Sequence, residues 1–493
     1  MKYVKTQTWF LLIIFVFCLF YFQSKADPIQ LKMIEFGRSK TQTEHTSDLM
    51  AQLPAQFLVA TLSGFKEVVA GALWVRADDF FHKGDFESIV PIVRAVTWLD
   101  PHNIDVFSTG AWHLDYNFVD NNSISDKRYI PSSIALLKEG IANNPDQWDL
   151  YFDLAWTHYN KKLYDFETGL KYMEIAVAKE GFDPNTGEKR ARPDFVDRML
   201  AHQYVKVGKL DKAIEHWEKA TKRTKELINS SEGKRLFVDQ SSFSVIDRNL
   251  SLLYLRIAYR YGDMDAYRKG LEVFERVIEK NASPNVSEEK KAYKRAKADY
   301  EKRLAQGGFI GDAQKPLDAG FTVQWRRVGP RKLEIKGKIN LVNAEEYKDM
   351  VSEAITNWYS DNQKQSAEMR VQWRDGSRVI WKLTDFDYEL PNPKSFSYQI
   401  DRTQTVQWDT LYVSGGQFND VIDFSDTAFY PFNSDKYRLE VYYIPRDPCA
   451  PDFIQDRIGF LGEALQDPHL DKNFLPGFNV LKKEFIIHRD EIL

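Results

Sequence analysis

The chain of 493 residues has only two cysteines, Cys18 and Cys449. Because Cys18 lies in an apolar run near the N-terminus, no disulfide can form within the part of the chain that follows that run. The same count excludes a zinc site built from cysteines. Basic charge is not in excess either. With a formal net charge of -4, the composition gives no indication of a nucleic-acid-binding protein.

Motifs of common catalytic sites are also missing from the sequence. It contains no H-E-x-x-H, no G-x-S-x-G, no P-loop and no G-x-G-x-x-G. His113 and Asp115 could resemble a catalytic pair, but residues two apart on a helix point to different faces. His113, His158 and His202 fall near the aromatic position of successive helical segments, where packing explains them. We therefore expect no enzymatic activity, no catalytic residues, no metal site and no cofactor.

Long apolar runs are absent with one exception, Trp9 to Phe22, which follows Lys2 and Lys5. A basic start and a short apolar core are typical of an export signal, so residues 1–26 are predicted to be a signal-anchor or a signal peptide. An uncleaved anchor would make a single-pass protein. Its N-terminus would be cytoplasmic and the bulk of the chain periplasmic or at the cell surface. Cleavage at Ser24-Lys25-Ala26 would make the protein secreted.

Residues 194–227 carry the spacing of two short antiparallel helices. Small residues stand where the helices cross, and large ones fill the space between them; Gly208 stands at the turn, where a positive φ is often needed. The residues are Leu200, Ala201, Tyr204, Gly208, Leu210, Ala213, Trp217 and Ala220. This pattern resembles the tetratricopeptide repeat (TPR), although the tryptophan of the first signature position is missing. The resemblance implies a right-handed superhelix whose groove binds a segment of a protein partner.

Further copies indicate an array, because one helical pair cannot bury its apolar face alone. They run over residues 70–101, 103–145 and 146–179, and a degenerate pair follows at 246–280. We expect an α-solenoid over residues 48–306, preceded by a polar stalk at 27–47. The charged stretch 286–306 is predicted to be its solvated terminal helix. A glycine-containing linker follows at 307–320.

From Phe321 the apolar period changes to two, as Leu333, Ile335, Ile339 and Leu341 show. We expect a mostly antiparallel β-sandwich-like domain over residues 321–493 with one helix at 344–360. Its strands are predicted near 321–326, 333–341, 368–374, 378–384, 396–402, 404–413, 437–443 and 483–488. The fold class is thus multidomain α + β, with an N-terminal membrane helix, a TPR-like α-solenoid and a β-rich C-terminal domain.

The β-rich domain offers two alternative ligand classes. Asp420, Asp423, Asp426 and Asp435 are predicted to lie on loops, where carboxylates could bind calcium, but their spacing matches no EF-hand. Four tryptophans could stack on sugar rings if they were exposed, although alternation places most of them in the core: Trp325, Trp373, Trp381 and Trp408. A glycan or calcium ligand, or an enzymatic role for this domain, is therefore the less favoured alternative.

The favoured hypothesis is a non-catalytic, membrane-tethered scaffold or adaptor in a bacterial cell-envelope assembly. Protein partners would bind in the groove of the repeats, and the N-terminal helix would contact the membrane. Residues on the first helices of the repeats are the candidates for partner binding: Arg76, Asp79, Tyr204 and Lys206. A self-assembling surface or filament component is a third hypothesis.

Overall fold

The computed structural model describes residues 64–117, 127–181, 188–189, 192–235, 238–279, 286–341, 378–389, 403–446 and 452–493. The chain divides into two compact units, residues 1–107 and 108–493. The predicted anchor 1–26, the stalk 27–47, the helix 344–360 and the strands 368–374 and 396–402 lie outside the described residues. Within the described ranges, no helix is long and apolar enough to cross a membrane. The predicted domain boundaries remain predictions.

The described part of the first unit is a pair of helices, α4 (Lys66–Lys83) and α5 (Ile89–Leu99). Helix α4 ends at Gly84, whose φ of 72° is the left-handed conformation that glycine adopts at little steric cost. Leu73 and Ala77 of α4 and Val93 and Val96 of α5 are buried. Residues 70–101 therefore form a helical pair, as predicted.

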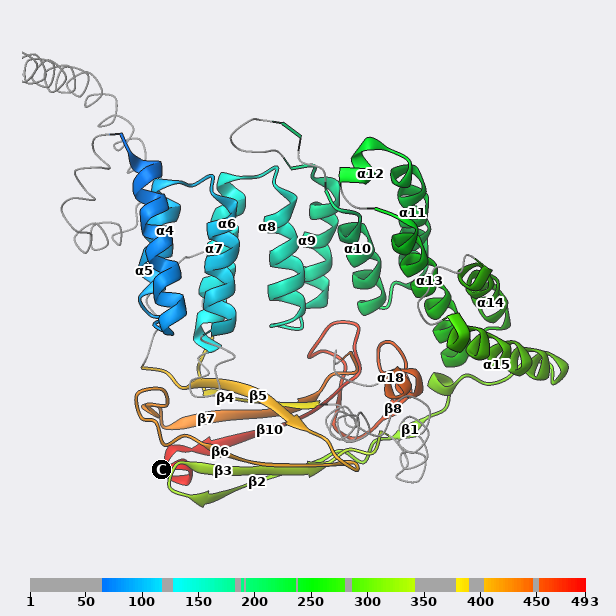
Figure 1. The fold of residues 1–493 in the computed structure, drawn as a ribbon. Coiled ribbons are helices and arrows are strands. Elements are labelled where there is room, and N and C mark those ends of the chain that lie inside the picture. The colour runs from blue at the N-terminus through cyan, green and yellow to red at the C-terminus, as the bar shows by residue number, and fades with distance from the viewer. Residues whose placement is uncertain are drawn as a thin grey trace, which may run out of the picture. The chain divides into compact units, whose positions relative to one another are not determined.

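The second unit contains further helical pairs (Figure 1). Its helices are α6 (Ile104–Trp112, which starts in the first unit), α7 (Ile130–Asn143), α8 (Trp148–Phe152), α9 (Phe166–Ala178), α10 (Asp194–Lys206), α11 (Leu210–Ile228), α12 (Ser231–Arg235), α13 (Gln240–Tyr261) and α14 (Met264–Glu279). Ala201, Ala213, Trp217 and Ala220 are buried in one apolar cluster. The prediction of tandem helical pairs is confirmed in these residues.

Two of the first helices continue into π-helical turns, at His113–Asn117 and Asp153–Asn160. A π-helical turn holds more residues than an α-helical turn. The second of these turns ends the first helix of the repeat 146–179. Its chain reversal passes through Tyr164, which has a φ of 53°.

The helical region ends with α15 (Val286–Ala305). Its Tyr293 and Tyr300 pack against the apolar cluster of α13 and α14, while most of its other described side chains are exposed. This agrees with the predicted solvated terminal helix. Gly307 and Gly308, both with positive φ, end the helix.

Two antiparallel sheets follow. The first has the order β2 (Thr322–Gly329), β3 (Lys332–Lys338) and β6 (Gln417–Asp423). The second has the order β5 (Val406–Tyr412), β4 (Arg378–Asp385), β7 (Lys436–Tyr443), β10 (Val480–His488) and β9 (Leu470–Asp471). A short parallel pair joins β1 (Leu317–Asp318) to β8 (Leu465–Gln466).

Both larger sheets contribute to one apolar core. Leu333 and Ile335 come from the first sheet, and Val379, Leu439 and Val441 come from the second. The predicted alternation along β3 and β7 is confirmed by these buried side chains. Trp381 also lies in this core and Trp325 packs against it, whereas Trp373 lies outside the described residues.

Strand β6 corrects the sequence analysis, because Asp420 and Asp423 lie on this strand and not on a loop. Only Phe418 in this strand is buried, so its apolar alternation is too weak to reveal a strand. The preceding Gly415 and Gly416 have φ of 57° and 73°. Two successive positive φ values fit the tight turn that joins antiparallel segments.

The helical pairs of the second unit pack directly on the five-stranded sheet and its loops. Ile380, Ile444, Phe478 and Val480 share an apolar cluster with residues of α9, α10 and α11. The ring of Phe166 at the start of α9 lies 5.8 Å from that of Phe478. The sheets therefore cover part of the repeat surface within this unit.

Candidate binding sites

Two of the predicted partner-binding residues, Arg76 and Asp79, are exposed on α4 in the first unit. The guanidinium of Arg76 lies 5.3 Å from the centre of the Phe80 ring. Asp79 forms an ion pair with Lys83 at 2.6 Å. Both side chains are exposed, and because an exposed ion pair of this kind contributes little to stability, Asp79 can exchange Lys83 for a partner at little cost.

Tyr204, the third predicted residue, is buried in the core between α9, α10 and α11. Its hydroxyl donates to Oε1 of Glu174 at 2.5 Å, and its ring stacks on His216 at 4.8 Å. Burial, followed by the hydrogen bond to Glu174, raises the pKa of the Tyr204 phenol. The ring therefore serves packing, and only the hydroxyl edge faces other polar groups.

Lys206, the fourth predicted residue, lies where the helices meet the sheets. Its Nζ donates to Oδ1 of Asn160 at 3.2 Å and lies 4.9 Å from the centre of the Trp156 ring. Burial, with smaller effects from Arg446 and Lys161, lowers the pKa of Lys206 to about 7. The structure thus places this lysine in a contact inside the chain.

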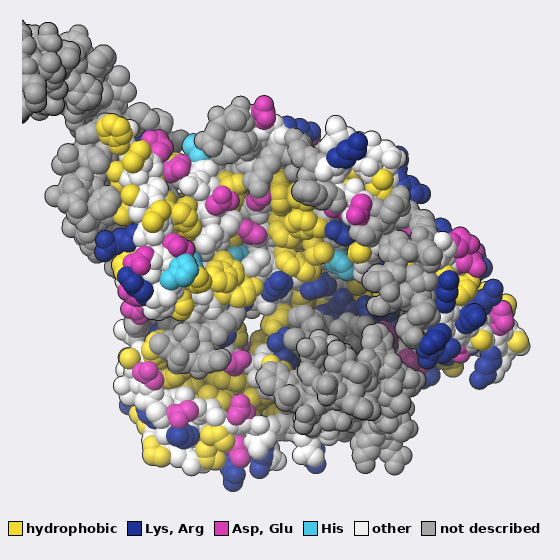
Figure 2. Space-filling view, in the orientation of Figure 1, with side chains coloured by type: hydrophobic (Ala, Val, Ile, Leu, Met, Phe, Trp, Pro, Cys, Tyr) yellow, Lys and Arg dark blue, Asp and Glu magenta, His cyan; other side chains and the backbone are white. Residues whose placement is uncertain are grey.

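Lys206 belongs to a group of cations at this contact. Arg260 of α13 is fully buried, pairs with Asp456 at 2.7 Å and lies 3.5 Å from the Phe460 ring. Burial and the neighbouring Arg260 lower the pKa of Arg446 to about 9. Figure 2 shows Lys and Arg side chains gathered beside the ends of α8 to α10 that face the sheets.

His113 and His202 serve packing, as predicted, whereas His158 forms an internal pair that the sequence did not predict. His113 is buried and contacts Asn117, and His202 lies edge-on to Trp217 with ring centres 4.8 Å apart. Burial and nearby cations lower the pKa of His202 to about 4. His113 and Asp115 do not pair, because Asp115 turns toward His158.

Asp115, Ser133 and His158 form a polar cluster that sequence spacing did not reveal. Nδ1 of His158 lies 2.8 Å from Oδ2 of Asp115 and 2.9 Å from Oγ of Ser133. In a Ser-His-Asp triad the serine and the aspartate contact opposite ring nitrogens. Here both contact Nδ1, and all three residues are buried. The cluster links helices and does not have the geometry of a nucleophile.

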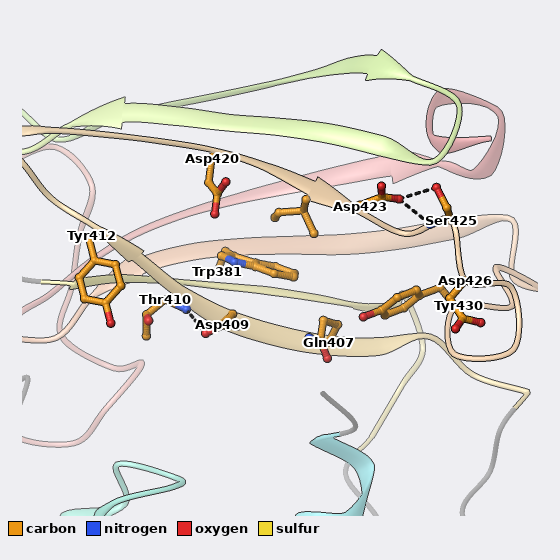
Figure 3. A pocket seen from close by; sticks show the side chains of 11 residues that line it. Trp381, Gln407, Asp409, Thr410, Tyr412, Asp420, Asp423, Ser425, Asp426 and Tyr430 are labelled. Carbon is orange, nitrogen blue, oxygen red and sulfur yellow. Dashed lines mark hydrogen bonds between the residues drawn. The ribbon is translucent and has the colours of Figure 1, made fainter. Parts of the chain in front are cut away.

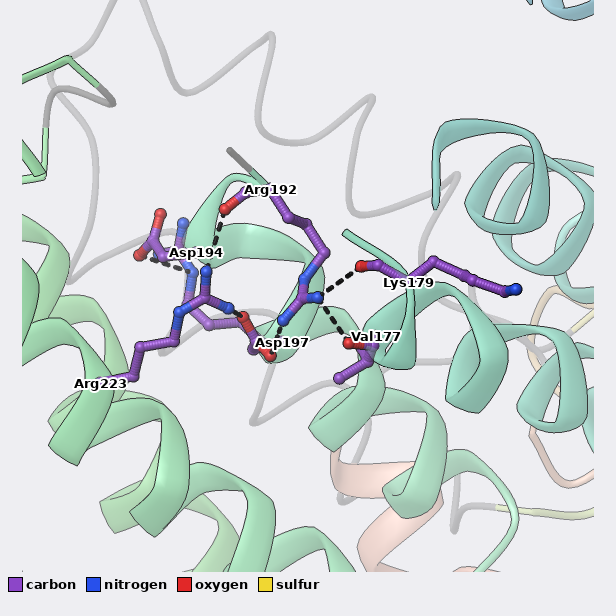
Figure 4. Close-up of polar contacts among 7 residues, drawn as sticks. Val177, Lys179, Arg192, Asp194, Asp197 and Arg223 are labelled. Carbon is purple, nitrogen blue, oxygen red and sulfur yellow. Dashed lines mark hydrogen bonds and ion pairs between the residues drawn. The ribbon is translucent and has the colours of Figure 1, made fainter. Parts of the chain in front are cut away.

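A second polar network ties α9, α10 and α11 together (Figure 4). Arg192 donates to the carbonyls of Val177 and Lys179 and pairs with Asp197 at 3.0 Å. Arg223 pairs with the other oxygen of Asp197 and donates to the carbonyl of Arg192 at 3.1 Å. This network stabilises the repeats and leaves little of Asp197 for a partner.

A cleft with a volume of about 520 Å³ lies between the two sheets. This volume lies in the range of small-molecule sites. Figure 3 shows side chains from β4, β5 and β6 and from the loop after β6 around it. They are Trp381, Gln407, Asp409, Thr410, Tyr412, Asp420, Ile422, Asp423, Ser425, Asp426 and Tyr430.

The cleft brings together three of the four aspartates considered for calcium, namely Asp420, Asp423 and Asp426. Asp423 pairs with Lys332 at 2.8 Å, and Lys332 and Ser425 hold its pKa at about 2. Across the described ranges, no group of three His, Cys, Asp or Glu residues has the arrangement to hold a metal ion. Gln407 and Asp409 also line the cleft, and no sequence motif marks either of them as a binding residue.

No protein-family model matches the chain, and the comparison with curated proteins finds no match. Among solved structures, one crystal structure of MamA shows 18% identity with a TM-score of 0.27, covering 44% of this chain and 96% of MamA. A tetratricopeptide repeat protein from Parabacteroides merdae shows 12% identity with a TM-score of 0.30, covering 48% of this chain and 79% of that protein. At these scores the similarity is too weak to support a functional argument.

Proposed function

We propose that this chain is a non-catalytic scaffold that binds protein partners through its helical repeats. The tandem packing of helical pairs carries this proposal, because stacked repeats form extended surfaces that suit protein binding. Within the second unit, the repeats already pack against a folded part of the same chain, namely the two sheets and their loops. In this proposal the two sheets form a sandwich-like domain that supports or spaces the repeats.

The proposal includes a membrane tether. The apolar run Trp9 to Phe22 after Lys2 and Lys5 supports a single-pass anchor with the bulk of the chain outside the cytoplasm. A scaffold held there would act in a bacterial cell-envelope assembly. Fractionation of cells expressing the tagged full chain tests this tether, which is refuted if the protein is recovered without membranes at an unshortened mass.

Arg76 and Asp79 are the residues through which partner binding is best tested, because they are exposed on a first helix. The tagged full chain is captured from solubilised membranes, and bound proteins are identified by mass spectrometry. The variant Arg76→Glu with Asp79→Lys reverses both charges. The control Glu218→Lys with Lys222→Glu reverses two exposed charges on α11, a second helix.

Loss of a stoichiometric partner in the α4 variant, with retention in the α11 control, would support partner binding through the first helices. A partner that is unaffected by either variant would contradict that assignment. If no partner is captured with any version of the full chain, the scaffold function itself is wrong.

A further inference from the structure

The cleft between the sheets lies at their open edges. Strand β5 is the outer strand of the five-stranded sheet, and β6 is the outer strand of the three-stranded sheet. The two strands are joined by the turn at Gly415 and Gly416, yet β5 pairs with β4 and β6 pairs with β3. They therefore separate and leave the space that forms the cleft (Figure 3).

Strand register shows which polar side chains face this space. Residues directly opposite each other in neighbouring strands point to the same face of a sheet. Asp409 is opposite Trp381 and Gln407 is opposite Leu383, and both apolar partners belong to the core between the sheets. Asp420 is likewise opposite the core residue Ile335. Gln407, Asp409 and Asp420 thus face the inter-sheet space.

Gln407 lacks a hydrogen-bond donor there. The residue is 5% exposed, and among the described residues its Oε1 has no hydrogen-bond partner. An unsatisfied buried acceptor costs roughly 1–3 kcal/mol. A ligand that donates a hydrogen bond in the cleft would remove this cost.

The charge of the cleft indicates what kind of donor it suits. Four carboxylates line it, those of Asp409, Asp420, Asp423 and Asp426, whereas none of its eleven lining residues is Lys, Arg or His. Lys332 offsets the charge of Asp423. The carboxylates are spread over β5, β6 and the loop after β6, so an extended organic cation could reach several of them.

We propose that this cleft binds a ligand through a positively charged ammonium or guanidinium group. Asp409 and Asp420 hold the cation from opposite edges, and Gln407 accepts one of its hydrogen bonds. The ring of Tyr430 lines the same space and offers a face for cation–π contact. The proposal concerns the sheets and does not depend on the scaffold function of the repeats.

Two sources could supply such a group, a free polyamine or a basic side chain of a peptide. Binding of spermidine and of a short peptide containing arginine and lysine is measured by calorimetry on the full chain at low and high salt. The corresponding peptide with acetylated lysine and with citrulline in place of arginine has no side-chain cation. We expect binding of at least one charged probe that weakens with salt, and no binding of the uncharged peptide.

Two variants and one control test the residues. Asp409→Asn and Asp420→Asn each remove one cleft charge and should weaken binding on the order of tenfold. The control is Asp435→Asn. Asp435 is exposed, lies outside the cleft and pairs with Arg489 at 3.5 Å. Its replacement removes an equal charge and should change the affinity for the probes by less than about twofold. Folding of each variant is checked by thermal unfolding.

Inward-pointing charges on edge strands also prevent strands of different molecules from pairing. If that is the role of Asp409 and Asp420, the two variants will form oligomers, and the wild-type chain will bind neither charged probe. That result would overturn the proposal. Equal weakening by Asp435→Asn, or binding of a neutral oligosaccharide in preference to both cations, would overturn it as well.

Discussion

At the scale of single residues, Lys206 shows how burial changes a charge. Its folded-state pKa of about 7 lies below the ordinary 10.5, mainly because of burial. Between these two pH values the unfolded chain binds more protons at this site than the folded chain does. Stability from this residue therefore rises as pH increases from about 7 to about 10.5 and is lowest below pH 7.

Replacing Lys206 with Met tests this effect. We expect Lys206→Met to stabilise the fold by about 2 kcal/mol at pH 6 and to reduce the rise in stability toward pH 10. The lost hydrogen bond to Asn160 offsets part of this gain. Chemical denaturation at pH 6 and pH 10 measures both changes. As a control, Lys171→Met replaces an exposed lysine of α9 and should leave the dependence of stability on pH as in the wild type. If Lys206→Met were destabilised at both pH values, the assigned cost of burying the charge of Lys206 would be refuted.

Sequence alone placed the packing residues well. Ala201, Ala213, Trp217 and Ala220 are buried where their helical spacing put them. Tyr204 and Lys206 were assigned to a binding surface because they lie on a first helix. The helical spacing also predicts Tyr204 as a packing residue, and the structure bears out this role. The sequence could not show that the sheets meet the repeats beside Lys206, because that contact depends on residues distant in the chain.

At the scale of helices, Asp197 connects three of them. It is the carboxylate between Arg192 and Arg223, and its side chain is 17% exposed. Asp197→Asn leaves the largely buried Arg192 without its counter-charge, which should destabilise the fold by about 2 kcal/mol. Urea unfolding followed by circular dichroism measures this loss. Glu215→Gln breaks the exposed pairs with Lys212 and Lys219 and should leave the midpoint unchanged. Equal midpoints for both variants would contradict the role of Asp197.

The β elements show where sequence patterns fail. Strands β3 and β7 have an apolar residue at alternate positions and were predicted correctly. Strand β6 is an edge strand with polar residues on both faces, so its pattern indicated a loop. The sequence does not reveal the cleft either, since Gln407 and Asp409 lie on one sheet and Asp420 on the other, and only the packing of the two sheets brings them together.

At the scale of the second unit, specific polar contacts join the repeats to the sheets. Arg260 and Asp456 are far apart in sequence but form an ion pair, and Tyr261 donates to Glu463 at 2.7 Å. Gly208 at the turn of α10 and α11 approaches Leu461 so closely that a Cβ there would lie 2.8 Å from a Leu461 methyl carbon. Such contacts have no local sequence signal, because each needs the complete fold of both parts.

Asp456→Asn tests whether this contact joins the stability of the two parts. The substitution removes the counter-charge of Arg260, whose side chain is fully buried, so we expect a loss of about 3 kcal/mol. If helices and sheets unfold together, hydrogen exchange should become faster in α13 and in β10 to the same extent. Asp265→Asn, which breaks exposed pairs with Arg268 and Lys269 on α14, should change neither. Faster exchange in α13 alone would contradict joint unfolding. It would show that the sheets keep their stability without the repeats and that the two parts dock as independent units.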